Sequence, residues 1–117
     1  MIFVIDDDEI MSECIKKACG GTAKVFCFNN AIEAMAEIDK TGVPNLIFLD
    51  ILLDGPDGFT FLNELLSYSD TGRIPVVVVT SLNLEEKDLS EYGVVGVLDK
   101  DTMKPEEIFD YVEKYSN

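Results

Sequence analysis

An aspartate stands in the middle of an apolar run in the stretch Leu46-Ile47-Phe48-Leu49-Asp50-Ile51-Leu52-Leu53. A carboxylate that leaves water costs free energy unless a partner compensates for its charge. The N-terminus repeats the arrangement, because the apolar run Ile2-Phe3-Val4-Ile5 is followed by Asp6-Asp7-Asp8. Two strands of the buried type that both end in carboxylates predict an acidic pocket at one edge of a sheet. We expect the function to lie in that pocket.

Apolar runs alternate with amphipathic segments along the chain, and each apolar run predicts a strand, at residues 2–6, 23–28, 45–49, 75–80 and 94–98. Continuous hydrophobicity, clearest in Val76-Val77-Val78-Val79, favours strands buried on both faces, as in a parallel sheet. The amphipathic segments predict helices over residues 9–19, 30–40, 58–68, 84–92 and 105–115. This alternation indicates an α/β fold, a doubly wound five-stranded parallel sheet, in one domain over residues 1–117.

Glycines mark the expected helix ends, at Gly20-Gly21, Gly42 and Gly93. Asn29 is expected to cap the second helix, and Pro105 suits the first turn of the last one. Asp8 also fits a helix N-cap, which is the alternative to a role in the pocket.

The charge balance limits the partners of the chain. It has 9 basic and 23 acidic residues, a net charge of −14, with Arg73 as its single arginine. Nucleic-acid binding needs clustered Lys and Arg, so we expect no direct nucleic-acid contact, and a cation or a partner with a basic face fits better. No run approaches the roughly 20 apolar residues of a membrane span. No basic region precedes the N-terminal apolar run, so we expect neither a membrane segment nor a signal peptide.

Three cysteines are present, at positions 14, 19 and 27, with no C-x-x-C motif and no histidine. This disfavours zinc sites and thioredoxin-like chemistry, and the lack of histidine excludes a His-based catalytic triad on this chain. We expect ordinary thiols in a reducing cytoplasm.

Polar side chains follow four of the five expected strands. In a doubly wound fold the site lies beyond the carboxyl ends of the strands, so these side chains should converge at one edge of the sheet. They are Asp6 and Asp7 after the first strand, Asp50 after the third, Thr80 and Ser81 after the fourth, and Lys100 after the fifth. Loop formation alone is the alternative explanation for Thr80 and Ser81.

The expected cluster has a definite chemistry. Two unit charges about 4 Å apart repel by roughly 4 kcal/mol at an effective dielectric near 20, so a cation is favoured, and Mg²⁺ prefers such oxygen ligands. A lysine and a hydroxyl can hold a tetrahedral dianion in front of Asp50. An aspartate carboxylate is itself a competent nucleophile in phosphoryl transfer, forming an acyl phosphate.

The chain resembles the receiver domains of two-component response regulators over essentially its whole length. The motifs that carry the resemblance, in chain order, are Phe3-Val4-Ile5-Asp6-Asp7-Asp8, Leu46-Ile47-Phe48-Leu49-Asp50, Asp57-Gly58, Val79-Thr80-Ser81 and Gly96-Val97-Leu98-Asp99-Lys100. The resemblance implies a (βα)5 flavodoxin/CheY-like fold with strand order 2-1-3-4-5.

The resemblance also implies roles for single residues. Asp50 would accept a phosphoryl group from the phosphohistidine of a sensor histidine kinase or phosphotransfer protein, while Thr80 and Lys100 would contact the phosphoryl oxygens. We assign the lysine role to Lys100 rather than Lys104, because Lys104 lies about six residues past the strand and is expected at the surface. Asp101 replaces the proline that usually follows this lysine, so we expect a trans peptide there.

For the metal, the resemblance implies Mg²⁺ bound directly by Asp7 and Asp50, with Asp6 acting mainly through water and the backbone carbonyl of Leu52 as a further ligand. Leu52 and Leu82 occupy positions that tune access of hydrolytic water in this family. Apolar side chains at both positions should slow hydrolysis of the phosphoryl group.

Two other departures from the family concern switching and the pocket. Val97 stands where a switching Tyr or Phe is common, so activation would run through Thr80 and its loop alone. Asp54 replaces a common proline, which adds a carboxylate near the pocket or serves turn formation.

On the first helix the apolar stripe is wide, so Ile10 and Cys14 should be exposed. In the family this helix docks on the kinase; an oversized core stripe is the alternative.

The sequence therefore predicts a cytoplasmic signalling switch rather than a metabolic enzyme, acting on a downstream protein target or an output domain. A receiver-like interaction module that works without phosphorylation is the alternative. A magnesium-dependent phosphatase would need a second aspartate where Leu52 stands. A flavin-binding module would need a phosphate-cradling loop in place of Asp6-Asp7-Asp8.

Overall fold

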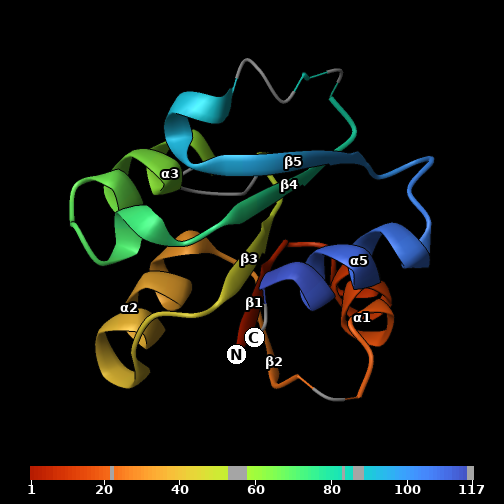
Figure 1. The fold of residues 1–117 in the computed structure, drawn as a ribbon, viewed down its shortest axis with the longest axis horizontal. Helices are drawn as coiled ribbons and strands as arrows, with labels where there is room; N and C mark the ends of the chain where they lie inside the picture. The colour runs from red at the N-terminus through yellow and green to blue at the C-terminus, as the bar shows by residue number, and fades with distance from the viewer. Residues whose placement is uncertain (22, 53–57, 83, 86–88, 116–117) are drawn as a thin grey trace.

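Five parallel strands form one sheet in the order β2-β1-β3-β4-β5 (Figure 1), which confirms the predicted fold and strand order. The structure is a computed structural model and describes residues 1–21, 23–52, 58–82, 84–85 and 89–115. The strands are β1 (Ile2–Ile5), β2 (Val25–Phe28), β3 (Leu46–Leu49), β4 (Val76–Thr80) and β5 (Val94–Asp99).

Helices cover both faces of the sheet, with α1 and α5 on one side and α2 and α3 on the other (Figure 1). Their bounds are α1 (Glu9–Ala18), α2 (Ala31–Thr41), α3 (Gly58–Leu66) and α5 (Pro105–Tyr115), with short 3₁₀ helices η1 (Thr71–Arg73) and η2 (Ser90–Tyr92). Two layers of helices around one parallel sheet explain why β1, β3 and β4 are buried along their whole length, whereas the edge strands β2 and β5 are partly exposed.

The side chains of β1 show how one strand supports both cores. Ile2 and Val4 pack toward α1 and α5, while Phe3 and Ile5 pack toward α2 and α3, because successive side chains of a strand point to opposite faces. All four are fully buried. The sheet is therefore held rigidly from both sides, which fixes the positions of the residues at its edge.

Most of the predicted helix ends are confirmed. Gly20 and Gly93 follow helical segments with φ of +81° and +79°, the left-handed backbone that favours glycine. Asp8 caps α1, its Oδ1 accepting from the backbone N–H groups of Ile10 and Met11 at 3.0 and 3.2 Å.

The expected cap of α2 is wrong by one residue. Asn30, not Asn29, is the N-cap, and its side-chain oxygen accepts from the Glu33 N–H at 2.8 Å. Asn30 and Glu33 stand at the spacing of a capping box, a signal that sequence reasoning could have used.

The helix expected over residues 84–92 is described only in part. Residues 84–85 lie outside any helix, Leu89 is helical, and the chain then passes into η2. The predicted helix is therefore wrong at residues 84–85, and a 3₁₀ turn precedes Gly93; positions 86–88 lie outside the described residues.

Within the described ranges, no helix has the length and apolar character that a membrane crossing requires.

The cysteines are free thiols, with Cys14 and Cys27 exposed and Cys19 buried. Burial, together with the neighbouring Cys27, raises the pKa of Cys19 to about 11. This thiol is therefore protonated at neutral pH, as expected for a structural cysteine.

Candidate functional site

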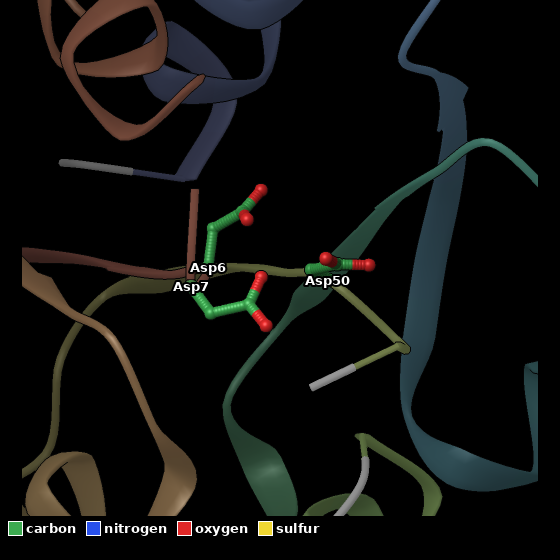
Figure 2. A group of neighbouring side chains, drawn as sticks. All are labelled: Asp6, Asp7 and Asp50. Atoms are coloured by element: carbon green, nitrogen blue, oxygen red, sulfur yellow. The ribbon is translucent and has the colours of Figure 1, made fainter. Parts of the chain in front are cut away.

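The register of the sheet brings two of the predicted aspartates side by side. Ile5 at the end of β1 pairs with Leu49 at the end of β3, so Asp6 and Asp50 follow neighbouring strand ends. The backbone continues the ladder, because the Asp50 N–H donates to the Ile5 carbonyl at 2.9 Å and the Asp6 N–H to the Phe28 carbonyl at 3.0 Å. Backbone hydrogen bonds at the strand ends thus position both aspartates. Figure 2 shows their side chains.

Asp7 completes a group of three carboxylates. One oxygen from each of Asp6, Asp7 and Asp50 lies within 4.8 Å of the others (Figure 2). Asp6 and Asp50 are buried, with 2% and 5% of their surface exposed, whereas Asp7 is exposed. A site with two buried oxygen donors and one solvent-facing donor is open on one side, which suits a hydrated divalent cation.

Lys100 connects the two buried carboxylates. Its Nζ lies 2.9 Å from Asp6 Oδ2 and 3.0 Å from Asp50 Oδ2. Its backbone N–H donates to the Thr80 carbonyl at 3.0 Å, which anchors the lysine at the end of β4. Burial opposes the charge of Lys100, but its interactions with the Asp6 and Asp50 carboxylates together outweigh this effect and raise its pKa. The lysine is therefore fully charged at neutral pH.

The buried Asp6 carboxylate is only partly compensated. Its Oδ1 accepts from the Asp8 N–H at 2.9 Å, and its Oδ2 has Lys100 as an ion-pair partner but makes no well-oriented hydrogen bond. Burial raises the pKa of Asp6, against the lowering effects of Lys100 and the Asp8 N–H. This carboxylate would be stabilised by a further positive charge at the site.

Asp50 and Thr80 are each held by a backbone N–H two residues further along the chain. The Leu52 N–H donates to Asp50 Oδ1 at 3.0 Å, and the Leu82 N–H donates to the Thr80 hydroxyl at 3.1 Å. Thr80 is fully buried at the end of β4, whereas Ser81 is exposed. The structure therefore brings Asp6, Asp7, Asp50 and Lys100 into one cluster, with Thr80 attached through the backbone of Lys100.

The segment after Lys100 forms a hydrogen-bonded turn. The Asp101 N–H donates to Asp99 Oδ1 at 2.8 Å, and the Met103 N–H donates to the Asp99 carbonyl at the same distance. The described residues contain no cis peptide bond, so the trans peptide expected before Asp101 is confirmed. Lys104 is exposed, as predicted.

Other residues singled out in the sequence differ in their exposure. Leu52 and Leu82 are 56% and 40% exposed, and Val97 is half-buried on β5. Ile10 is 78% exposed and Cys14 is also exposed, which confirms the expected apolar surface on α1. The predictions for Asp54 and Asp57 concern positions outside the described residues.

Sequence reasoning missed Ser12. This residue is buried on α1, and its hydroxyl lies 3.4 Å from the Asp6 carbonyl, to which it donates. Ser12 stands three and seven residues before the buried Ile15 and Cys19, so helical periodicity places it on their face. Because serine is polar, the sequence pattern alone assigns this residue to the surface.

Comparisons with known proteins agree with this geometry. The family model of the response regulator receiver domain matches residues 2–113. The transcriptional regulatory protein AruR of Pseudomonas aeruginosa is 35% identical over 89 residues, which is 72% of this chain and 35% of AruR. The chain thus spans about a third of the length of that relative.

Solved structures show the same fold. The Mn²⁺-bound form of response regulator Rcp1 aligns with a TM-score of 0.73 and 28% identity, over 97% of this chain and 88% of that one. The chemotaxis protein CheY4 of Vibrio cholerae, 20% identical, aligns with a TM-score of 0.84 over 97% of this chain and 96% of its own, a likeness of fold alone. Together with the family match over nearly the whole chain, these findings show that the protein belongs to the response regulator receiver domain family.

Proposed function

We propose that this chain is a phosphoacceptor switch, in which Asp50 accepts a phosphoryl group from the phosphohistidine of a sensor histidine kinase or phosphotransfer protein. The observation that supports this most is the position of Lys100 Nζ, within 3.0 Å of carboxylate oxygens of both Asp6 and Asp50. A buried carboxylate beside a fixed lysine and a second acid is suited to receive a dianion.

The three carboxylates fit a divalent cation, and Mg²⁺ is our choice. Asp7 and Asp50 would bind it directly, Asp6 mainly through water, and the Leu52 backbone carbonyl would add a further ligand. The partly compensated Asp6 and the closeness of three acids favour a cation at this position. When bound, the ion would supply positive charge toward the equatorial phosphoryl oxygens.

In the transfer step, an Asp50 carboxylate oxygen attacks phosphorus while the bond from phosphorus to the donor's imidazole nitrogen breaks. The electron pair of that bond stays on the imidazole, which takes up a proton. The Leu52 N–H fixes the orientation of the Asp50 carboxylate. Lys100 and the Thr80 hydroxyl then contact the phosphoryl oxygens. The Lys100 ammonium group, which pairs with the free Asp50 carboxylate, would now pair in part with the phosphoryl dianion.

The site predicts a stabilisation by Mg²⁺ that depends on Asp7. At about a hundred times its Kd, Mg²⁺ should raise the free energy of unfolding by about 2.7 kcal/mol. Asp7→Asn should lower the Mg²⁺ affinity by at least about tenfold, because it removes an exposed ligand without disturbing the core. Beryllium fluoride, a phosphoryl mimic, should bind only with Mg²⁺ present, as followed by ¹⁹F NMR.

Asp8→Asn is the matched control for Asp7→Asn. It removes the same charge one residue away, and asparagine caps a helix as well as aspartate does. Equal weakening of Mg²⁺ binding by the two variants would show a diffuse charge effect and would count against the assigned ligand.

Leu52 and Leu82 predict a long-lived phosphoryl group. Both side chains are partly exposed beside the groups that would hold it, and neither can hydrogen-bond to an attacking water. Replacing either with asparagine should speed hydrolysis by about tenfold, equivalent to about 1.4 kcal/mol in the barrier. Decay of the phosphorylated protein, followed by intact mass, checks this. A wild-type lifetime of only seconds would contradict it.

Receiver domains act with histidine kinases and output domains in two-component systems, and we place the partners of this one by its surface. The exposed Ile10 and Cys14 on α1 suit the kinase or phosphotransfer protein. The target, or an output domain, would contact the face around β5 and α5, in the cytoplasm. Catalysis would be limited to its own phosphorylation and dephosphorylation. The departures at Asp54, Val97 and Asp101 are the reason to test the alternative of a module that works without phosphorylation, whereas the intact site positions support the phosphoacceptor.

A further inference from the structure

A groove lies between α2 and α3. Both helices are on the face of the sheet opposite α1 and α5 (Figure 1). It consists of two adjoining hollows, of about 350 and 290 Å³, which share Met35, Asp39 and Glu64 as lining residues. None of the aspartates at the carboxyl edge of the sheet lines it. The groove is therefore separate from the phosphoacceptor site.

Exposed apolar side chains stand at both ends of this groove. Ile32, at one end, is 64% exposed, and Val43 and Tyr68, at the other end, are 42% and 60% exposed. The helix α2 packs on the sheet through Ala31, Ala34 and Ile38, so the exposed Ile32 is not part of that buried contact. Single exposed apolar residues are ordinary, but several around one concave surface indicate a binding site.

The charged residues that line the groove are all acidic. Asp39 and Glu64 stand where the two hollows meet, Asp70 lines the far end, and no lysine or arginine among the described residues lines either hollow. An apolar groove with an acidic middle attracts a segment that is apolar on one side and basic on the other.

The α-helices that the structure describes do not supply such a segment. In each of α1, α2, α3 and α5, acidic residues equal or outnumber basic ones; α1, the most balanced, has Glu9 and Glu13 beside Lys16 and Lys17. With a net charge of −14, a second copy would repel the groove. A basic segment of a partner protein matches the acidic lining of the groove in charge.

We infer that the groove between α2 and α3 docks a short, basic amphipathic helix of a partner protein. From Ile32 to the end of α2 at Thr41 the helix is about 15 Å long, at about 1.5 Å per residue, which matches nearly three turns of a docked helix. Its apolar residues would contact Ile32, Met35 and Tyr68, and its Lys or Arg residues would face Asp39 and Glu64. This surface requires no phosphoryl group on Asp50.

Titration of the ¹⁵N-labelled protein with a synthetic helical Leu/Lys peptide, followed by NMR chemical shifts, tests this docking site. The largest shift changes should fall on residues 31–43 and 60–71, around the groove. Asp39→Lys should weaken binding by about tenfold, because it reverses the charge at the centre. Glu37→Lys is the matched control: it makes the same charge change on the same helix but does not line the groove, and should have little effect.

A second pair of variants tests the apolar contacts. Tyr68→Ser should weaken peptide binding, whereas Leu66→Ser, which removes another exposed side chain outside the groove, should leave the affinity unchanged. Spectra of the free variants establish that each is folded. The inference is overturned if a scrambled peptide of equal composition binds as well, if the shift changes fall on α1 and α5, or if Glu37→Lys weakens binding as much as Asp39→Lys. Concentration-dependent shifts at the groove without peptide would also overturn it, by indicating self-association.

Discussion

Lys100→Met should lower the free energy of unfolding by roughly 2–4 kcal/mol in the absence of Mg²⁺. The lysine side chain is 13% exposed and pairs with Asp6 and Asp50, whose side chains are only 1% and 6% exposed. Removing the ammonium group leaves two neighbouring buried carboxylates without their shared counter-charge. Urea unfolding in the presence of a chelator measures the loss.

The pH dependence of this loss has a definite sign. Without Lys100, the pKa of Asp6, already raised by burial, should rise further. When the folded-state pKa of a carboxyl lies above its unfolded value of 3.8, the folded state binds more protons between these two pKa values. The free energy of unfolding therefore decreases as the pH rises through that window. The difference between the wild-type protein and Lys100→Met should therefore shrink as the pH falls through it.

Lys104→Met is the control for Lys100→Met. It removes the same charge from an exposed lysine, and should change stability by no more than about 0.5 kcal/mol. Saturating Mg²⁺ should restore part of the stability of Lys100→Met, because the cation would compensate the same carboxylates. A Lys100→Met protein as stable as the wild type near pH 8 without Mg²⁺ would contradict the proposed electrostatics.

Gly58→Ala should destabilise the protein by about 1–3 kcal/mol and slow phosphorylation of Asp50. A Cβ at this position would lie 2.6 Å from the Ile51 Cα and 3.0 Å from the Asp50 carbonyl oxygen. The Gly58 N–H also donates to the Ile51 carbonyl at 2.9 Å, so the start of α3 and the residue after Asp50 are locked together. The backbone next to Asp50 must therefore shift, although alanine is the better helix former by roughly 1 kcal/mol.

Gly72→Ala separates this steric effect from the general effect of replacing a glycine. The nearest atom to a Cβ at Gly72 is the Leu65 carbonyl oxygen at 3.6 Å, an ordinary contact. Its stability and its rate of phosphorylation should stay close to those of the wild type. If Gly58→Ala behaves like Gly72→Ala in both measurements, the close contact between α3 and the Asp50 segment affects neither stability nor phosphorylation.

The sheet and the position of the acidic cluster could be predicted because both depend on regular features. Parallel strands that end in Asp6 and Asp50 must bring these residues to the same edge, whatever the side chains around them. The choice of Lys100 over Lys104 rested on spacing from β5, and the structure places Lys100 against both acids while Lys104 is exposed.

The features that were missed depend on local geometry that a residue pattern does not determine. Asn29 and Asn30 are equally good caps by type, and only the backbone decides which side chain reaches the Glu33 N–H. Ser12 is expected at the surface from its polar side chain, yet its position on α1 buries it against the Asp6 carbonyl. The double ion pair of Lys100 likewise depends on the turn after β5, which no single motif specifies.

Intact mass after incubation with acetyl phosphate, with and without Mg²⁺ and beside Asp50→Asn, tests the proposed phosphoacceptor function most directly. We predict the addition of one phosphoryl group to the wild-type protein when Mg²⁺ is present. Omission of Mg²⁺ or the Asp50→Asn substitution should abolish it. Absence of the adduct, under conditions that label another receiver domain, would contradict the proposal and favour a module that binds its partners without phosphorylation.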